Sequence, residues 1–107
     1  MNIRDIDLNL LSVFEAIYID ENISRAADRL GISQPATSNA LNRLRQTFND
    51  PLFVRSGGSM LPTPRAEELS GPIRQALSLI QTSIEKTAEF DYHSAEVTFN
   101  LAMSDYS

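Results

Sequence analysis

The chain contains no cysteine, and this absence excludes several kinds of site. Without thiols it can form neither a disulfide framework nor a thiolate metal site, as is typical of a reducing compartment. It also lacks an apolar run long enough to cross a membrane and an apolar block behind a basic amino terminus. We therefore expect a cytoplasmic protein that binds no membrane, no metal and no cofactor.

Histidine is nearly absent, which argues against an enzyme. His93 is the only one, and no cysteine or clustered carboxylate pair surrounds it. Neither a nucleophile with its base nor a metal site can be assembled from this set. The pair Gly57-Gly58 is not followed by Lys-Ser or Lys-Thr, so it is not a phosphate-binding loop. We predict no catalytic residues and place His93 in a solvated linker.

Basic residues are too few to balance the acids, and the formal net charge is −5. This balance is unusual for a nucleic-acid-binding protein, because phosphate contacts supply much of the affinity. The deficit is local, however, since residues 67–107 hold two basic residues against seven acids. Between Ser33 and Arg65 the only acid is Asp50, against four arginines. The charge distribution therefore permits nucleic-acid binding by the first part of the chain.

What the sequence does contain is a pattern of two helices joined at a glycine. Ser24 is a good N-cap for the first helix, and Ala27 is small enough for two helices to cross closely. Gly31 supplies the positive φ that ends a helix, and Ile32 then fills the corner. This order of residues predicts a helix-turn-helix over residues 23–42.

The second predicted helix has two different faces. Ser33 caps it, and Pro35 lies in its first turn, where a missing N–H has no consequence. One face carries apolar residues and a threonine at helical spacing, namely Thr37, Ala40, Leu41, Leu44 and Phe48. The threonine hydroxyl needs a partner there, and we expect the carbonyl one turn back. The other face carries Gln34, Ser38, Asn39, Asn42 and Arg43.

The residue types on this polar face favour DNA binding. Gln and Asn can pair bidentately with adenine, and Arg can do so with guanine. A face meant only for solubility usually contains Glu and Lys, and neither occurs between Ser24 and Arg45. The alternative is an ordinary helical hairpin whose polar face meets water.

A helix is also expected before this motif. Asp5 or Asp7 can cap it, and it ends near residues 20–22. Its apolar face, with a predicted role in the core, contains Leu8, Leu11, Phe14, Ala16 and Ile17 or Tyr18.

After the motif the sequence predicts a β-hairpin. Two β-prone segments, residues 52–56 and 59–63, flank Gly57-Gly58. A hairpin at this place is a wing. We assign to Arg55, where the first strand meets the turn, a phosphate or minor-groove contact in preference to simple solvation.

A longer helix follows, from a cap at Thr63 towards Phe90. Its apolar stripe has steps of four or three and consists of Leu69, Ile73, Leu77, Ile80 and Ile84. A single small domain has no obvious place to bury it, so we favour packing against the same helix of a second copy. The alternative is that the stripe packs on the first helix.

The last segment differs from the rest. Asp91–Glu96 is polar and resembles a linker, and Val97–Met103 alternates like a half-buried strand. One strand cannot form a sheet, so the chain stops at the start of a second domain in this interpretation.

Several of these motifs, in order, resemble the DNA-binding region of LysR-type transcriptional regulators, in particular a LeuO-like and NodD-like branch. They are Asp7–Leu11, Ser24–Ser38, Pro51–Arg55 and Pro62-Thr63. The resemblance implies a mainly α fold, a winged helix-turn-helix followed by a long linker and dimerisation helix. By position it implies groove contacts from Gln34, Pro35, Ser38 and Asn39, and DNA-backbone contacts from Ser24, Ser33 and Arg55.

The predicted organisation is a DNA-binding domain at 1–63, a linker and dimerisation helix at 64–90, and a hinge with the first strand of a missing effector-binding domain at 91–107. The predicted function is sequence-specific binding of promoter or operator DNA in the nucleoid, as a dimer or tetramer on an imperfect inverted repeat. A small-molecule effector would bind only the full-length protein. A protein-binding module is the alternative. The predicted DNA-binding residues are Ser24, Ser33, Gln34, Pro35, Ser38, Asn39, Asn42, Arg43, Arg45 and Arg55.

Overall fold

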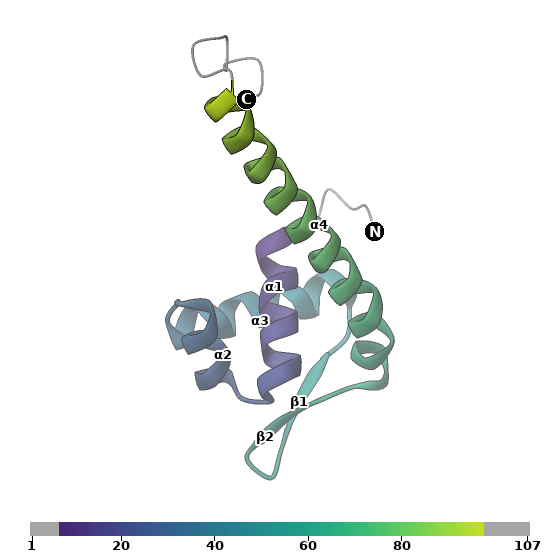
Figure 1. Cartoon of the computed structure of the whole chain (residues 1–107). Helices are drawn as coiled ribbons and strands as arrows, with labels where there is room; N and C mark the ends of the chain where they lie inside the picture. Colours follow the sequence, from purple (N-terminus) through teal and green to yellow (C-terminus); the bar gives the residue numbers. More distant parts are fainter. Residues whose placement is uncertain (1–6, 98–107) are drawn as a thin grey trace. The chain divides into compact units, whose positions relative to one another are not determined.

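The computed structural model describes residues 7–97, with side chains placed for residues 7–86. The chain divides into two units, one up to Gln75 and one from Ala76. The fold is mainly helical with a two-stranded antiparallel hairpin, which confirms the predicted class (Figure 1). Its elements in order are α1 (Leu8–Asp20), α2 (Ile23–Leu30), α3 (Gln34–Phe48), β1 (Phe53–Ser56), β2 (Ser59–Pro62) and α4 (Pro64–Val97).

Helix α1 is capped by Asp7, whose carboxylate accepts a hydrogen bond of 2.9 Å from the Asn9 N–H. Its buried face consists of Leu10, Val13, Phe14, Ala16 and Ile17. The prediction that Leu8 belongs to this face is wrong, since its side chain is 54% exposed. The residues of the buried face follow one another at helical steps of three and four, and the first of them is Leu10 rather than Leu8. Leu11 and Tyr18 are half-buried.

Helix α2 is capped by Asn22, and the prediction of Ser24 as its N-cap is wrong. The Asn22 side-chain oxygen accepts from the Arg25 N–H at 2.9 Å, while its own backbone is extended. Ser24 is the second residue of the helix. Asn and Ser are comparable caps, so residue type alone does not favour Asn22 over Ser24.

The turn between α2 and α3 is formed as predicted at Gly31, which has a φ of +71°. The Ile32 N–H donates to the Ala27 carbonyl at 3.1 Å and closes the turn. Ala27 is buried. The Ile32 side chain is 41% exposed, so the prediction that it fills the corner is wrong.

Helix α3 packs its predicted apolar face into the core. Ser33 caps it, accepting from the Ala36 N–H at 3.1 Å. Thr37, Leu41 and Leu44 are buried. The Thr37 hydroxyl donates to the Ser33 carbonyl at 3.0 Å, which confirms the predicted partner and explains how a hydroxyl is accommodated here.

The hairpin forms where it was predicted, with Arg55 opposite Met60 and Phe53 opposite Pro62. Gly57 and Gly58 both have positive φ, as a tight primed turn requires. The ring of Phe53 lies 5.2 Å from that of Phe14, so the first strand packs directly on α1.

Two main-chain hydrogen bonds hold the hairpin in place, one to the end of α1 and one across the base of the hairpin itself. The Met60 N–H in β2 donates to the Glu21 carbonyl at the end of α1, at 2.9 Å. The Thr63 N–H donates to the Leu52 carbonyl at 2.8 Å. The wing is therefore an extension of the domain's core.

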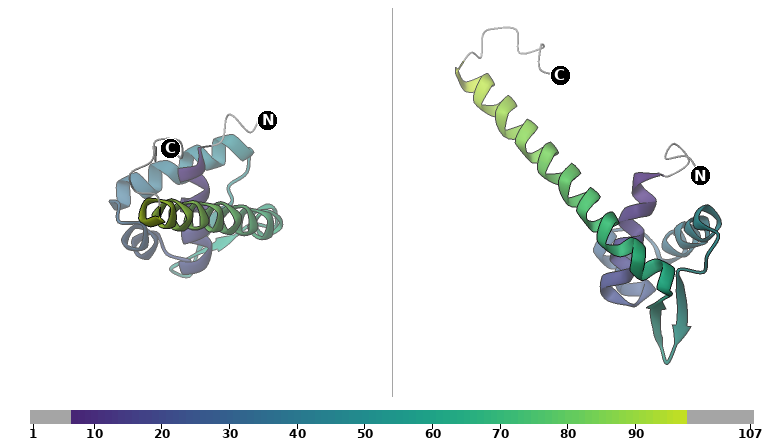
Figure 2. Two further views of the ribbon diagram at one scale, coloured as in Figure 1. Left: turned by 45° about the horizontal axis from the view of Figure 1, so that its top comes forward. Right: turned by 90° about the vertical axis from the view of Figure 1, so that its right-hand side faces the viewer.

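The stripe of α4 is buried only near its start. Ala66 and Ile73 are buried and Leu69 is half-buried, so the first part of the stripe belongs to the core of the chain itself. In this part Arg74 approaches Glu15 of α1 at 3.9 Å, and both views in Figure 2 show the start of α4 crossing α1. Farther along, Leu77 is half-buried, and the exposed side chains are Leu79, Ile80 and Ile84.

Helix α4 extends to Val97, past the end predicted at Phe90. Residues 91–96, His93 among them, are helical, so the prediction of a linker there is wrong. The strand predicted at Val97–Met103 is not formed at Val97, and residues 98–103 lie outside the described part. No helix of the described part has the length and apolar character to cross a membrane.

Candidate nucleic-acid interface

The polar edge of α3 faces away from the core. Its exposed residues are Gln34, Pro35, Ser38, Asn39, Asn42 and Arg43. The buried residues of the same helix alternate with them at helical spacing. The division of α3 into a core face and an outward polar edge is thus confirmed.

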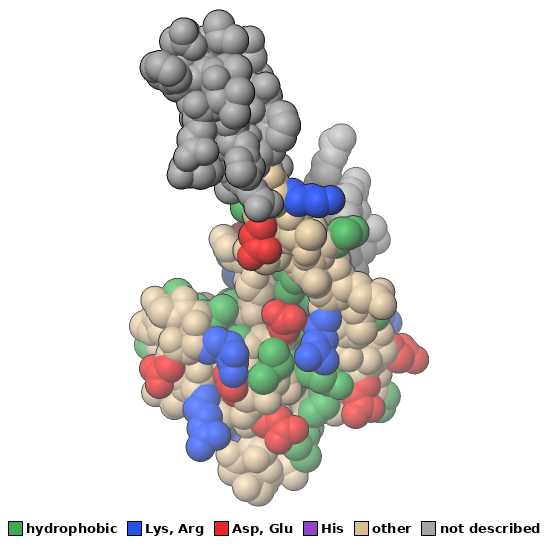
Figure 3. Space-filling model, in the orientation of Figure 1, with side chains coloured by type: hydrophobic (Ala, Val, Ile, Leu, Met, Phe, Trp, Pro, Cys, Tyr) green, Lys and Arg blue, Asp and Glu red, His purple; other side chains and the backbone are tan. Residues whose placement is uncertain are grey.

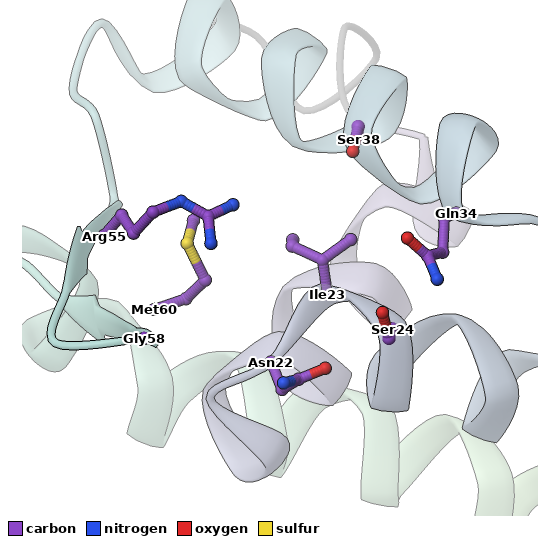
Figure 4. Close-up of a pocket in the computed structure, with 8 residues that line it drawn as sticks. All are labelled: Asn22, Ile23, Ser24, Gln34, Ser38, Arg55, Gly58 and Met60. Atoms are coloured by element: carbon purple, nitrogen blue, oxygen red, sulfur yellow. The ribbon is translucent and has the colours of Figure 1, made fainter.

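A cleft of about 240 Å³ lies between the amino-terminal ends of α2 and α3 and the wing. It is lined by Asn22, Ile23, Ser24, Gln34, Ser38, Arg55, Gly58 and Met60 (Figure 4). The Arg55 guanidinium extends from β1 into this space, opposite the helices. The Ser24 hydroxyl and the Gln34 amide point towards one another from α2 and α3. The structure therefore brings together residues predicted from three separate segments.

A second cleft, of about 250 Å³, shares Ser38 and Arg55 with the first. It extends along α3 towards Asn42 and Arg45. Both linings contain arginine, serine and amide side chains, and neither contains a carboxylate. Such a lining offers donors and positive charge, which suit the phosphates and base edges of a nucleic acid.

Ser24 and Ser33 remain available for a DNA-backbone contact. Ser24 is exposed on the wall of the first cleft. The Ser33 oxygen accepts the Ala36 N–H, but its hydroxyl hydrogen can still be donated to a phosphate.

Arg45 is placed differently from the other predicted DNA-binding arginines. Its side chain is half-buried, and its guanidinium donates to the carbonyls of Pro51 and Phe53, both at 2.8 Å. A third bond, of 3.2 Å, goes to the Asn42 side-chain oxygen. Arg45 therefore holds the segment that leads into the wing. This role could not be predicted from the sequence, because the main acceptors are backbone carbonyls.

The remaining charges of the first unit are mixed in sign. On the face shown in Figure 3, arginine side chains are interspersed with Asp and Glu over the helices of this unit. Asp20 and Arg29 form a two-pronged ion pair with N–O distances of 2.8 and 2.9 Å. The hydrogen bond from Arg29 lowers the pKa of the Asp20 carboxyl, and the same bond raises the pKa of Arg29. This pair links the ends of α1 and α2.

The part of the chain that the structure describes holds no group of three or more potential metal-ligating side chains.

Residues 8–67 match a family described as "Bacterial regulatory helix-turn-helix protein, lysR family". The transcriptional activator NagR of Ralstonia sp. is 47% identical over 105 residues, which cover 98% of this chain and 35% of the relative. The transcriptional regulator LeuO of Escherichia coli is 50% identical over 101 residues, covering 94% and 32%. The chain thus spans about a third of the length of these relatives, both of which are described as regulators of transcription.

Solved structures agree with this match. A probable transcriptional regulator from Pseudomonas aeruginosa superimposes with a TM-score of 0.76 at 46% identity, over 78% of this chain and 28% of that one. The DNA-binding domain of BenM, in complex with its catB site 1 DNA, gives a TM-score of 0.73 over 79% and 96% of the two chains. At 24% identity, the second comparison supports the fold alone.

Proposed function

Because this chain belongs to the LysR family of bacterial regulatory helix-turn-helix proteins, we propose that it binds promoter or operator DNA in a sequence-specific manner, as part of a transcriptional regulator. The observation that carries the proposal is the exposed edge of α3. Gln34, Ser38 and Asn39 face outward, and Arg55 of the wing extends into the adjoining cleft, whose lining has no carboxylate. A double-stranded polyanion with hydrogen-bonding base edges matches this surface.

In the proposed complex α3 is the recognition helix and lies in the major groove. The amino-terminal residues of such a helix contact base edges. Gln34 and Asn39 distinguish base pairs, and a good bidentate contact contributes about 1 to 3 kcal/mol of discrimination. Pro35 and Ser38 come between these two residues in the sequence and also lie against the groove.

The wing and the helix ends supply position and affinity in this proposal. Arg55 contacts a phosphate or the neighbouring minor groove, and Arg43 contacts the backbone from the recognition helix. The hydroxyls of Ser24 and Ser33 donate to phosphates. These contacts carry little sequence information, but they orient α3.

We further propose that two copies pair through α4 and bind an imperfect inverted repeat in the cytoplasm, within the nucleoid. The exposed Ile80 and Ile84, with Leu77, form the contact in this proposal. Ile73 is only 7% exposed in the single copy, and so contributes mainly to its own domain. In a full-length protein, a further domain that senses a small molecule would regulate the dimer or a tetramer built from it.

The test is a selection followed by titration. The 107-residue chain is used to enrich duplexes from a randomised pool, and fluorescence anisotropy then compares the enriched duplex with a scrambled duplex of the same composition. We expect the enriched duplex to bind at least about a thousandfold more tightly. Affinity should fall steeply between low and moderate salt, because counterions are released. A folded chain that enriches no duplex and shows no salt-sensitive binding would instead favour a protein-binding module.

A further inference from the structure

We propose that Arg45 is a positioning residue for the wing. In this proposal its guanidinium fixes strand β1 against α3, and thereby sets where Arg55 meets the DNA. The inference rests on the proposed function, and it reassigns Arg45 from a DNA contact to a support for one.

The hydrogen bonds of Arg45 are suited to this role. Its Nε donates to the Pro51 carbonyl and one of its terminal nitrogens donates to the Phe53 carbonyl, both at 2.8 Å. These carbonyls stand on either side of Leu52, a fully buried residue with a φ of +62°. A left-handed leucine is unfavourable and persists only where its surroundings enforce it. The planar fork of a guanidinium can hold both carbonyls at once in a fixed orientation.

The same bonds determine the position of Arg55. Alternate residues of a strand point to the same face, so Phe53 and Arg55 lie on one face of β1. Arg45 holds the carbonyl of Phe53, two residues before Arg55, while the Phe53 ring is buried against Phe14. On the neighbouring strand, Met60 is opposite Arg55 and its N–H is bonded to the Glu21 carbonyl. The two strands of the wing are thus anchored separately, β1 to α3 and β2 to the end of α1.

Arg43 provides a matched control on the same helix. It has the same side chain, two residues earlier, but it is exposed whereas Arg45 is half-buried. If both arginines simply added positive charge near the DNA, replacing either would weaken binding independently of the wing. If Arg45 positions the wing, its loss should remove most of the contribution of Arg55.

A double-mutant cycle distinguishes these cases. Arg45→Met, Arg45→Lys and Arg43→Met are each made alone and with Arg55→Ala, and the affinity of each folded variant for the enriched duplex is measured by anisotropy. In the unaltered chain and in Arg43→Met, Arg55→Ala should weaken binding about tenfold, the effect of losing one charge-assisted contact. In both Arg45 variants we expect Arg55→Ala to weaken binding only about twofold, because the two sites are coupled.

Arg45→Lys separates charge from geometry. Lysine keeps the positive charge but is a point donor that cannot hold two carbonyls in a planar fork. If the lysine variant restores the full tenfold effect of Arg55→Ala, charge alone suffices and the proposal is wrong. Additive losses in the methionine variant would contradict it equally.

Amide hydrogen exchange supplies a readout that needs no DNA. In both Arg45 variants, the amides of β1 and β2 should exchange at least about tenfold faster, while those of α1 and α3 keep their protection. Unchanged exchange in the wing would overturn the proposal. If the unaltered chain binds no duplex, the proposed function fails, and exchange still decides whether Arg45 holds the wing.

Discussion

Helices α3 and α4 are both amphipathic, but they leave opposite kinds of surface exposed. Helix α3 buries its apolar face within the domain and exposes amides, hydroxyls and an arginine. Helix α4 buries Ile73 of its stripe and leaves Ile80 and Ile84 of the stripe, together with the neighbouring Leu79, exposed. A polar, carboxylate-free edge matches a polyanion, whereas an exposed apolar stripe matches another protein surface. The comparison is the basis for proposing DNA as the partner of α3 and a second copy of the chain as the partner of α4.

The largest expected effect comes from breaking the core face of α3. Leu44 is fully buried, so Leu44→Ala should lower the free energy of unfolding by about 2 to 5 kcal/mol. Gln46→Ala, on the exposed side of the same helix, should change it by less than about 0.5 kcal/mol. Urea unfolding followed by circular dichroism measures both. Similar values for the two variants would contradict the assignment of the faces.

A charged side chain in the apolar stripe of α4 tests whether this helix makes the proposed contact with a second copy. Ile84→Asp should abolish the proposed dimer and weaken binding to an inverted repeat about a hundredfold, because two linked domains bind with avidity. Sedimentation velocity and anisotropy measure the two effects. Ser83→Asp adds the same charge one residue away at another exposed position and should leave the dimer intact. If Ile84→Asp leaves the sedimentation coefficient unchanged, α4 does not form the contact.

Two substitutions on the DNA-facing side should have different kinds of effect on DNA binding. Gln34→Ala should lose about 1 to 3 kcal/mol of preference at one base pair and leave other sequences little affected. Arg55→Ala should weaken binding to every duplex alike and reduce the slope of log affinity against log salt by about 1. Anisotropy on a panel of single-base variants at several salt concentrations separates the two. Equal losses from both substitutions on every duplex would contradict these roles.

The smallest effect concerns pH. Arg29 lowers the pKa of Asp20 in the folded chain below its ordinary value of 3.8. The ion pair therefore stabilises the fold above that value, and this stabilisation is lost as pH falls through the lower, folded pKa. Asp20→Asn and Arg29→Met should each slightly reduce the urea midpoint at pH 7, and should approach the unaltered chain below pH 3.8. Equal differences at both pH values would show that the pair acts by packing rather than by charge.

Those parts of the fold that depend on local chemistry could be predicted from the sequence. Gly31 and the pair Gly57-Gly58 mark positions that need positive φ, and the turns form there. The partner of the Thr37 hydroxyl was predictable because a helix offers it a carbonyl one turn back. The outward edge of α3 followed from its helical period in the same way.

Features that depend on tertiary contacts, or on a choice between two nearly equivalent residues, could not be predicted. Asn22 and Ser24 are both good caps, and only the path of the backbone selects Asn22. Arg45 was assigned to DNA by its charge, whereas its partners are carbonyls six and eight residues further on. The polar segment 91–96 suggested a linker, but its composition does not prevent α4 from continuing through it.

At the tip of the hairpin, the backbone angles restrict which residues fit, whereas the surrounding space does not. A Cβ on Gly57 or Gly58 would meet no heavy atom within 4 Å, yet both residues have positive φ. Residues of mirror-image chirality adopt such angles readily. A chemically synthesised chain with D-alanine at these two positions should therefore keep the backbone angles of the turn, and should be more stable because D-alanine has less conformational freedom than glycine in the unfolded state.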